Sequence, residues 1–548
     1  MSVVPSPQRT PLDPPPISCH PGSLIPMDDH SEGSLIEIDH ASRQTQKFSN
    51  KPLRCTCFLL CCATTPNWCD IGQMTIDILP EDVLLVIFDH YVVEADGRRK
   101  FEEWQMLVHV CRKWRYAVFR SPLGLNLRIL CSAGTSVKEK LAPWPPLPII
   151  IDQYFPRPAE ISKCGQDNII EALGHDDRVC QIKMNISYPL LERVFSAMQK
   201  TFLGLKVLDL YIDGNYDRAL VVPDSFLGGS APDLRCLRLT CIPFPFPVLR
   251  KLLLSAPNLA ILSVRFIPDS GYFSPEAMVT CLSALTRLKL LNIGFEYLQS
   301  QPPLEGRRPP LTHSVLPALT GLEFTGAIEY LEDLVSRIDT PLLNRLYIRL
   351  KHSRPTTYDT PQLTQFLSRA PKLKAYDEAC VRHCDSHASF AVPGRDNLGL
   401  HLEISCHHGV LVSFMAQLCT SSFLQVLIPT QENLYILEHH SAWRQPYFKE
   451  NLKDHDFLDL FRPFTTVKNL YISREFVPPI ASALQELVGE RVIEVLPNLK
   501  CMFLEDIPES GFVPEAMLHF IAARQLSYRP ITISPWIWKN KYPGFEVY

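Results

Sequence analysis

One pattern of apolar and polar positions recurs from Val179 almost to the end of the chain. Large apolar residues repeat as L-x-x-L-x-L in loose form, and most copies begin roughly 24 to 31 residues after the preceding one. The end of each phrase alternates apolar and polar residues, which predicts a short strand with one buried face. The phrases begin at Val179, Leu205, Leu234, Leu259, Leu288, Leu319, Leu343, Leu373, Val467 and Leu499.

Segments between the phrases have the apolar spacing of helices. A proline follows several of them, as in Ala256-Pro257-Asn258-Leu259 and Ala370-Pro371-Lys372-Leu373, and proline ends a helix because it lacks the backbone N–H. Each strand and helix leave apolar faces uncovered, so stacking of successive units would bury them. The predicted helices are Leu190 to Lys200, Val248 to Ser255, Pro275 to Leu285, Ile328 to Ile338 and Pro361 to Arg369.

The spacing is that of leucine-rich repeats with a helix on the return side, and this part of the chain resembles that class. We therefore expect an α/β fold in which residues 153–525 form an irregular leucine-rich-repeat solenoid, with parallel strands on the concave side and helices on the convex side. An unrelated α/β sheet shares the alternation, but its strands would be more continuously apolar. Residues 526–548, with Trp536, Trp538 and Tyr542, are expected to form a cap or tail.

The repeat pattern is interrupted between Tyr376 and Asp459. Gly409 to Leu418 has helical spacing, and Leu424-x-x-Leu427 resembles a degenerate copy of the phrase. Cysteine and histidine are preferred zinc ligands, but their spacing here matches no familiar zinc site, so an irregular repeat is the simpler interpretation. These residues are Cys380, His383, Cys384, His387, Cys406, His407 and His408. After Pro478 the pattern returns, with predicted helices at Ala481 to Glu494 and Pro514 to Arg524.

Residues 76–119 predict a pair of helices of a different kind. Asp77 is suited to cap the first helix, and Pro80 fits its first turn, where a missing N–H costs nothing. Apolar residues recur at helical spacing in this helix, and again in a second helix from Trp104 to Val118 after a polar loop. A unit of this size rarely has a self-sufficient core, so part of its apolar surface is expected to meet a partner.

Leu79-Pro80, Ile87-Phe88, Leu107, Val110-Cys111 and Trp114 stand in the pattern of a known helical module. The stretch resembles the F-box, which docks on the Skp adaptor of cullin-RING ubiquitin ligases. The resemblance covers residues 76–152, and this stretch is similar in detail to F-box proteins of mushroom-forming fungi. The alternative interpretation of these residues is an anonymous helical hairpin. The resemblance to the F-box implies adaptor binding through Leu79, Pro80, Leu84, Ile87, Phe88, Leu107, Val110, Cys111 and Trp114, of which some must serve the module's own core.

Composition narrows the partners and the compartment. A net charge of −4 and a pI near 6.5 leave no strong field for nucleic acid or an anionic membrane surface. The sequence has neither an apolar run long enough to span a bilayer nor the hydrophobic region of a signal peptide, so we expect a cytoplasmic or nuclear protein. The 18 cysteines are then expected to be mostly reduced thiols.

Residues 1–70 are expected to be a disordered tether, and residues 71–152 the F-box module with its linker strands. The cysteines from Cys55 to Cys69 have three interpretations. The first is a metal site, but the spacing of the cysteines does not suit one. The second is palmitoylation beside Phe58-Leu59-Leu60, which is chemically easier than metal binding. The third, which we favour, is a hydrophobic segment without a function.

The sequence contains no phosphate-binding loop, no G-x-G-x-x-G turn, and neither G-x-S-x-G nor H-E-x-x-H. We therefore expect a protein that is not an enzyme and that needs no cofactor or metal. The resemblance implies a substrate-recognition subunit of a Skp–cullin–F-box ubiquitin ligase: a Skp-type adaptor, and through it a cullin, binds the F-box, and a protein target binds the solenoid. The alternative is an interaction or scaffold protein that uses the same modules outside a ligase.

Strand alternation places a row of polar residues on the concave face of the predicted sheet. The row mixes both charges with tyrosines and hydroxyls, unlike the uniformly basic strip that a nucleic acid would favour, and it contains arginine and aromatic anchors common at protein interfaces. The predicted target-binding residues are Asp209, Tyr211, Arg238, Ser263, Arg265, Asn292, Glu323, Tyr347 and Arg349, with Thr240 and Thr325 in the same row.

Overall fold

The computed structural model describes residues 79–92, 104–122, 125–153, 161–212, 222–268, 271–296, 313–351, 360–374, 377–384, 387–393, 399–405, 419, 421, 424–438, 454–505 and 514–537. Every described residue belongs to one compact unit, Met74–Tyr548. The predicted tether with its cysteines, the Gly409 to Leu418 helix, and Trp538 and Tyr542 lie outside the described residues.

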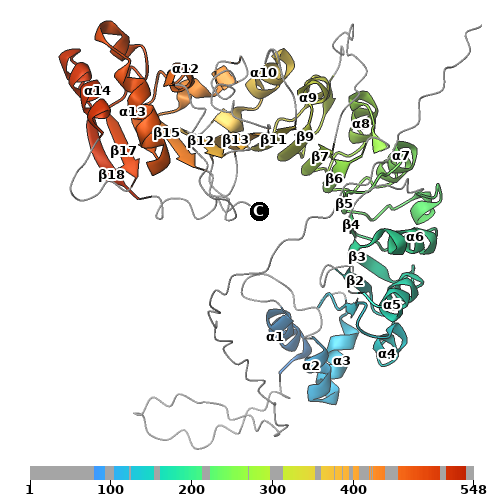
Figure 1. Cartoon of the computed structure of the whole chain (residues 1–548). Helices are drawn as coiled ribbons and strands as arrows, with labels where there is room; N and C mark the ends of the chain where they lie inside the picture. The colour runs from blue at the N-terminus through green and yellow to red at the C-terminus, as the bar shows by residue number, and fades with distance from the viewer. Residues whose placement is uncertain are drawn as a thin grey trace, which may run out of the picture. The chain divides into compact units, whose positions relative to one another are not determined.

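Most of the described strands form one long sheet that is parallel except around a single strand (Figure 1). In spatial order these strands are β1 (Ile129–Cys131), β2 (Ile149–Gln153), β3 (Val179–Ile186), β4 (Val207–Ile212), β5 (Cys236–Thr240), β6 (Ile261–Ile267), β7 (Leu290–Phe295), β9 (Gly321–Gly326), β11 (Arg345–Lys351), β14 (Gly399–Ser405), β13 (His387–Pro393), β12 (Glu378–Cys384), β15 (Asn433–Glu438), β16 (Asn469–Ile472), β17 (Cys501–Glu505) and β18 (Thr532–Trp536). A separate small sheet pairs β8 (Ser314–Val315) with β10 (Ile338–Asp339). The long sheet starts within the segment predicted as linker strands and ends in the segment predicted as a cap.

Helices alternate with most strands and lie on one face of the sheet (Figure 1). The α-helices are α1 (Glu81–Val92), α2 (Trp104–Val110), α3 (Arg112–Arg120), α4 (Val137–Leu141), α5 (Lys163–Leu173), α6 (Tyr188–Ala197), α7 (Phe246–Leu254), α8 (Pro275–Leu282), α9 (Ile328–Val335), α10 (Pro361–Ser368), α12 (Asp454–Phe461), α13 (Val477–Gln485) and α14 (Glu515–Leu526). Short 3₁₀ helices include η3 (Phe226–Gly229), η5 (Pro371–Lys374), η7 (Leu424–Val426), η8 (Ile428–Thr430), η9 (Arg474–Phe476) and η10 (Gly489–Ile493). The observed fold is a mixed α/β repeat with a long, mostly parallel sheet, which confirms the prediction at that level.

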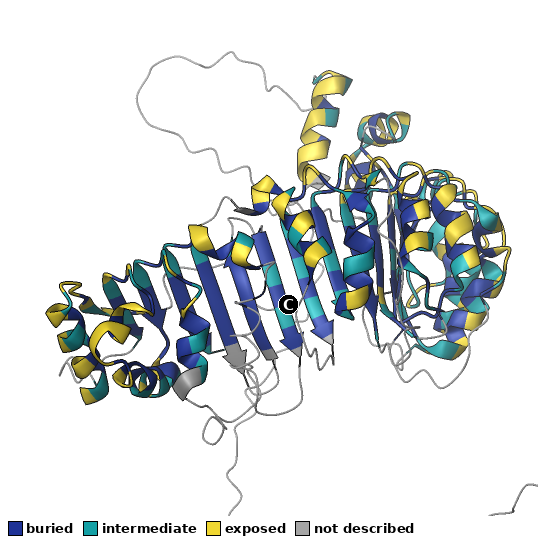
Figure 2. Cartoon of the chain, turned by 90° about the horizontal axis from the view of Figure 1, so that it is seen from above, coloured by how far each residue is buried: buried dark blue, intermediate teal, exposed yellow. Residues whose placement is uncertain are grey.

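Most predicted phrases place their last two apolar residues on a strand, pointing toward the helices. In β4, Leu208 and Leu210 are fully buried, while Asp209 between them points to the other face. The register aligns Leu208 with Leu237 of β5, so buried leucines form continuous rows. In Figure 2 much of the sheet has the dark blue of buried residues. Full burial of such a side chain contributes about 1.5–3 kcal/mol, and these rows therefore hold successive repeats together.

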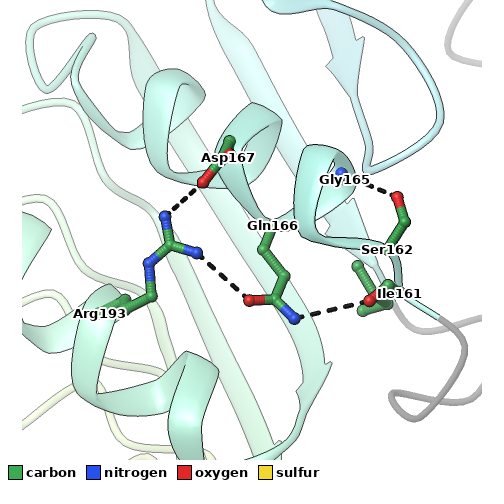
Figure 3. A network of polar contacts seen from close by, with 6 residues as sticks. All are labelled: Ile161, Ser162, Gly165, Gln166, Asp167 and Arg193. Carbon is green, nitrogen blue, oxygen red and sulfur yellow. Dashed lines mark hydrogen bonds and ion pairs between the residues drawn. The ribbon is translucent and has the colours of Figure 1, made fainter.

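Polar contacts also join neighbouring helices (Figure 3). Arg193 on α6 donates to the Asp167 carboxylate at 2.5 Å and to Gln166 Oε1 at 3.2 Å, both on α5. Ser162 caps α5, because its hydroxyl accepts the Gly165 N–H at 3.1 Å. Exposed ion pairs of this kind contribute at most about 1 kcal/mol, so the apolar rows dominate the stacking.

A carboxylate of one helix caps the next helix. Glu332 on α9 accepts the backbone N–H groups of Gln362 and Leu363, at 3.1 and 2.7 Å, in the first turn of α10. We expect Glu332→Ala to lower the free energy of unfolding by about 1 kcal/mol, and Glu332→Gln to lower it less, because an amide oxygen still accepts these protons. Chemical denaturation of both variants is the check; equal losses would contradict the capping role.

The irregular segment reverses the order of its strands. β12 is the first strand after α10 in sequence, but β14 is the strand that pairs with β11. β13 runs antiparallel between β14 and β12, and β12 pairs with β15. The predicted copy of the phrase at Leu424 is wrong, because Leu424 lies in the 3₁₀ helix η7 and the strand that follows is β15. Leu373, which begins another predicted phrase, lies in the 3₁₀ helix η5, and Tyr376 of that phrase lies outside the described residues.

Two predicted helices are divided in the structure. α2 and α3 separate at Cys111, which is extended with φ −156° and ψ 173°. The predicted helix from Ala481 to Glu494 consists of α13 and the 3₁₀ helix η10, separated near Gly489, whose φ of 64° favours glycine. Apolar spacing continues across both breaks, and periodicity alone therefore predicted a single helix in each case.

The last described strand has a protected edge. Thr532 donates its N–H to the Lys500 carbonyl at 2.9 Å, so by alternation the backbone nitrogen of Pro535 faces away from β17. Proline lacks the N–H that an added strand would need there, which is a common protection of edge strands. In the part of the chain that the structure describes, no helix has the length and apolar character needed to cross a membrane.

Candidate protein-interaction surfaces

Helices α1 to α3 pack around a small aromatic core. The Phe88 ring is fully buried, with its centroid 4.7 Å from that of Trp114. Trp104 packs on Trp144 at 5.0 Å, and its indole N–H donates to the Arg128 carbonyl at 3.0 Å, which fixes the helices to the segment that leads into β1. The predicted adaptor-binding residues whose side chains are buried in this core are Leu84, Phe88 and Leu107.

Other predicted adaptor-binding residues lie at the surface of the same helices. Ile87 is 41% exposed and Val110 is 57% exposed, Pro80 is exposed, and Leu79 is half-buried. Contiguous exposed apolar surface is typical of interaction sites, and α1 carries exposed apolar residues at helical spacing. The predicted adaptor-binding set leaves out four further exposed apolar residues on these helices: Val83, Val86, Tyr91 and Met106.

Cys111 and Trp114, the two remaining predicted adaptor-binding residues, have structural contacts. The Cys111 sulfur accepts the backbone N–H of Trp114 at 3.4 Å and thereby caps α3. Lys113, next to them, donates from Nζ to the Leu79 carbonyl at 3.0 Å, which ties α3 to the start of α1. Adaptor binding by the predicted set remains a prediction, with Ile87 and Val110 its most accessible apolar members on the helices.

The face of the sheet opposite the helices carries the predicted target-binding residues in two adjacent rows. The first row, given by the strand register, is Lys183, Asp209, Arg238, Ser263, Asn292, Glu323, Tyr347 and His401. The second row, two residues further along each strand, contains Asn185, Tyr211, Thr240 and Arg265, and then Thr325, Arg349 and Glu403. The structure therefore brings these side chains to one face, and binding of a target there remains a prediction.

Some residues of the first row pair with each other. Arg345 contacts the Glu323 carboxylate at 2.6 Å, and Glu323 also accepts from Asn292 Nδ2 at 2.5 Å. Arg238 and Asp209 form a longer ion pair at 3.4 Å. Burial raises the pKa of Asp209 above its ordinary value, although Arg238 acts in the opposite direction.

Tyr347, Arg349 and Glu403 form a tighter cluster across β11 and β14. Arg349 donates to the Tyr347 hydroxyl and to the Glu403 carboxylate, both at 2.8 Å, and the Tyr347 hydroxyl donates to Glu403. The His401 ring stacks on Tyr347 at 4.7 Å. Burial raises the pKa of Tyr347; for Glu403 the effect of burial is outweighed by Arg349, which holds the carboxyl pKa below its ordinary value. Sequence reasoning missed Glu403 and His401 because β14 carries no leucine phrase.

Acid should weaken this cluster. The folded-state pKa of Glu403 is lowered, so its contribution to stability is present above the unfolded-state pKa and is lost as the pH falls through the folded-state value. We expect the free energy of unfolding to fall more steeply below about pH 4.3 in the wild type than in Glu403→Gln, which lacks this titration. Chemical denaturation at several pH values tests this, and parallel pH profiles would contradict it.

An aromatic cluster occupies the same face of β15 to β18. Tyr435 stacks on Tyr471 with ring centroids 4.3 Å apart, and Tyr471 stacks on Phe503 at 4.4 Å. Trp536 packs against both tyrosines, and together with them it belongs to a hydrophobic cluster separate from the main core. Both tyrosines are buried, so these rings stabilise the C-terminal end of the sheet. The predicted row stopped at Arg349 and did not include them.

Among the described residues, no group of three or more histidine, cysteine, aspartate or glutamate side chains is placed to hold a metal ion. Cys380 is buried, and burial raises the pKa of its thiol. Cys384 and His387 pair in the backbone register of β12 and β13. Cys406, His407 and His408 lie outside the described residues.

No protein-family model matches the chain, and no curated protein matches it. The chain is similar to the crystal structure of the leucine-rich repeat-containing protein LegL7 from Legionella pneumophila, with 12% sequence identity and a TM-score of 0.24, over 73% of this chain and 97% of LegL7. The fold described above therefore rests on the strands and helices of the chain itself.

Proposed function

We propose that this protein is a substrate-recognition subunit of a Skp–cullin–F-box ubiquitin ligase. The observation that supports the proposal is the division of α1 to α3 into a buried core and an exposed apolar set. Phe88 and Leu107 fill the core, while Ile87 and Val110, which match the F-box pattern equally well, remain exposed. A pattern residue that is not needed for the core is free to serve a partner.

The long sheet would hold the target. Repeat sheets present many side chains in fixed positions over an extended surface, which suits recognition of another protein. The two rows on the face opposite the helices contain arginine and tyrosine, residue types that are enriched at protein interfaces. In this proposal the protein acts in the cytoplasm or nucleus and other subunits of the ligase transfer ubiquitin.

Affinity purification of the tagged full-length protein, with and without proteasome inhibition, tests the proposal. We expect a Skp-type adaptor and a cullin to co-purify, and a target to accumulate when the proteasome is inhibited. Purified material that contains no adaptor would overturn the proposal. Adaptor without cullin would favour an interaction protein that uses the same modules outside a ligase.

A further inference from the structure

We propose that the face of β4 to β7 opposite the helices binds an acidic segment of a protein partner, with an apolar side chain of the segment on a hydrophobic stripe and carboxylates on basic residues at either side. The inference deepens the proposed function, on which it rests, by assigning the chemistry that the target presents. It follows from three features of this face: the stripe, the basic residues that flank it, and a bulge in β6.

The stripe lies two residues before the first row of polar residues. The register aligns Val207, Cys236, Ile261 and Leu290 on consecutive strands. Cys236 is buried and the other three are half-buried, so their outer surfaces remain accessible. The stripe ends at Gly321, where a Cβ atom would lie 2.8 Å from Leu290 Cδ1, so the leucine side chain extends over the glycine.

Basic residues flank the stripe on both sides. Lys206, Arg235 and Lys289 stand directly before β4, β5 and β7, and all three are exposed. On the other side, Arg238 and Arg265 lie in the first and second polar rows. Rows two residues apart on a strand are separated by about 7 Å, a distance that neighbouring side chains of a bound peptide can span.

A bulge in β6 presents Arg265. Val264 pairs with Ile293 and Ile267 with Phe295, so two residues of β6 lie opposite the single residue Gly294 of β7. Phe266, inside the bulge, has a φ of 52°, which is unfavourable for a residue other than glycine. Bulges of this kind redirect a side chain, and Arg265 is exposed next to it, with its guanidinium 5.7 Å from the Phe266 ring centroid.

The charges of this region are not balanced among the described residues. Arg265 and the three exposed basic residues before the strands make no ion pair there, in contrast to the pairs of Glu323 and Glu403 on the neighbouring strands. On and directly beside β4 to β7 the basic residues are Lys206, Arg235, Arg238, Arg265 and Lys289, and the carboxylates are Asp209, Asp233 and Glu296. The excess is positive in a chain whose net charge is −4, and it therefore favours an acidic partner.

An acidic protein segment fits this face better than a nucleic acid. A phosphate backbone would gain from the basic residues but would place charged groups on the apolar stripe and close to the Asp209 carboxylate. A peptide with an aliphatic or aromatic residue between acidic residues would use both features. The occupant that we propose is therefore a carboxylate-bearing peptide segment of the target.

Selection from a phage-displayed library of random 12-residue peptides on the full-length protein tests the inference. We expect enriched peptides to contain an apolar residue flanked by aspartate or glutamate. A synthetic, fluorescein-labelled consensus peptide should bind at least tenfold more weakly to Arg235→Glu with Arg265→Glu than to the wild type. The matched control reverses two exposed charges on α7, Arg250→Glu with Lys251→Glu, and should bind the peptide with unchanged affinity.

Three results would overturn the inference: enrichment of neutral or basic peptides, equal losses in the two double variants, or tighter binding of a single-stranded RNA oligonucleotide than of the consensus peptide. A peptide with phosphoserine in place of glutamate that binds more than tenfold more tightly would replace the carboxylate by phosphate and overturn the assignment. Adaptor co-purification is measured on the same protein samples. Retained adaptor with failed peptide selection refutes only this inference, whereas absence of adaptor from the wild type refutes the proposed function.

Discussion

Replacing Ile87 and Val110 together by glutamate is expected to lower the affinity for a Skp-type adaptor at least about hundredfold. Both side chains are exposed, at 41% and 57%, so the change introduces charge at the surface and leaves the aromatic core intact. Truncating an apolar anchor of an interface typically costs about 2 kcal/mol or more, and burying an unpaired carboxylate there adds to that cost. Calorimetric titration of purified adaptor into the full-length protein measures the effect.

Tyr116→Glu on α3 is the control for this variant. Tyr116 is 61% exposed and lies outside the predicted adaptor-binding set, so the same introduction of charge on the same module should leave adaptor affinity unchanged. The thermal unfolding temperature should be the same for both variants and the wild type. Phe88→Ala, which removes a buried ring, should instead lower both stability and binding. Wild-type affinity of the Ile87 and Val110 double variant would refute the adaptor site.

Arg524→Ala is expected to destabilise the C-terminal repeats by about 3 kcal/mol. Arg524 on α14 is fully buried, and its guanidinium donates to the carbonyls of Val492, Pro497 and Leu499 at 3.4, 3.3 and 3.2 Å. These carbonyls belong to η10 and to the turn that leads into β17. Alanine leaves them without these donors and opens a cavity, so α14 loses the contacts that hold it to the preceding repeat.

The effect should be local, because each repeat is stabilised mainly by its neighbours. Hydrogen exchange should become faster in α13, α14 and β18 and stay unchanged in α5 and α6. Arg529→Ala is the matched control, since Arg529 is exposed and its backbone, not its side chain, contacts the Arg524 carbonyl. Unchanged exchange in α14 of the Arg524 variant would show that the arginine does not hold the helix.

The apolar spacing along the chain determined the strands and helices of the regular repeats. Leu208, Leu237 and their equivalents recur because each must face the helices from its own strand, and this requirement is local in sequence. For the same reason the sequence determined which residues share the opposite face, including Asp209 and Arg238. It also placed the helices of the N-terminal module, although it did not show that Cys111 would cap α3 and divide the second helix.

Tertiary structure alone decided which strands pair around the irregular segment and which charges meet there. Tyr347 donates to Glu403, 56 residues away, because β14 rather than β12 joins β11, and no local pattern encodes that choice. Tertiary structure also left Ile87 and Val110 exposed while it buried Phe88. An apolar side chain on a helix becomes part of the core or of the surface only when the neighbouring helices have packed. Local periodicity fixes the type of an element and its apolar face, whereas strand order and exposure depend on contacts between residues that are distant in sequence.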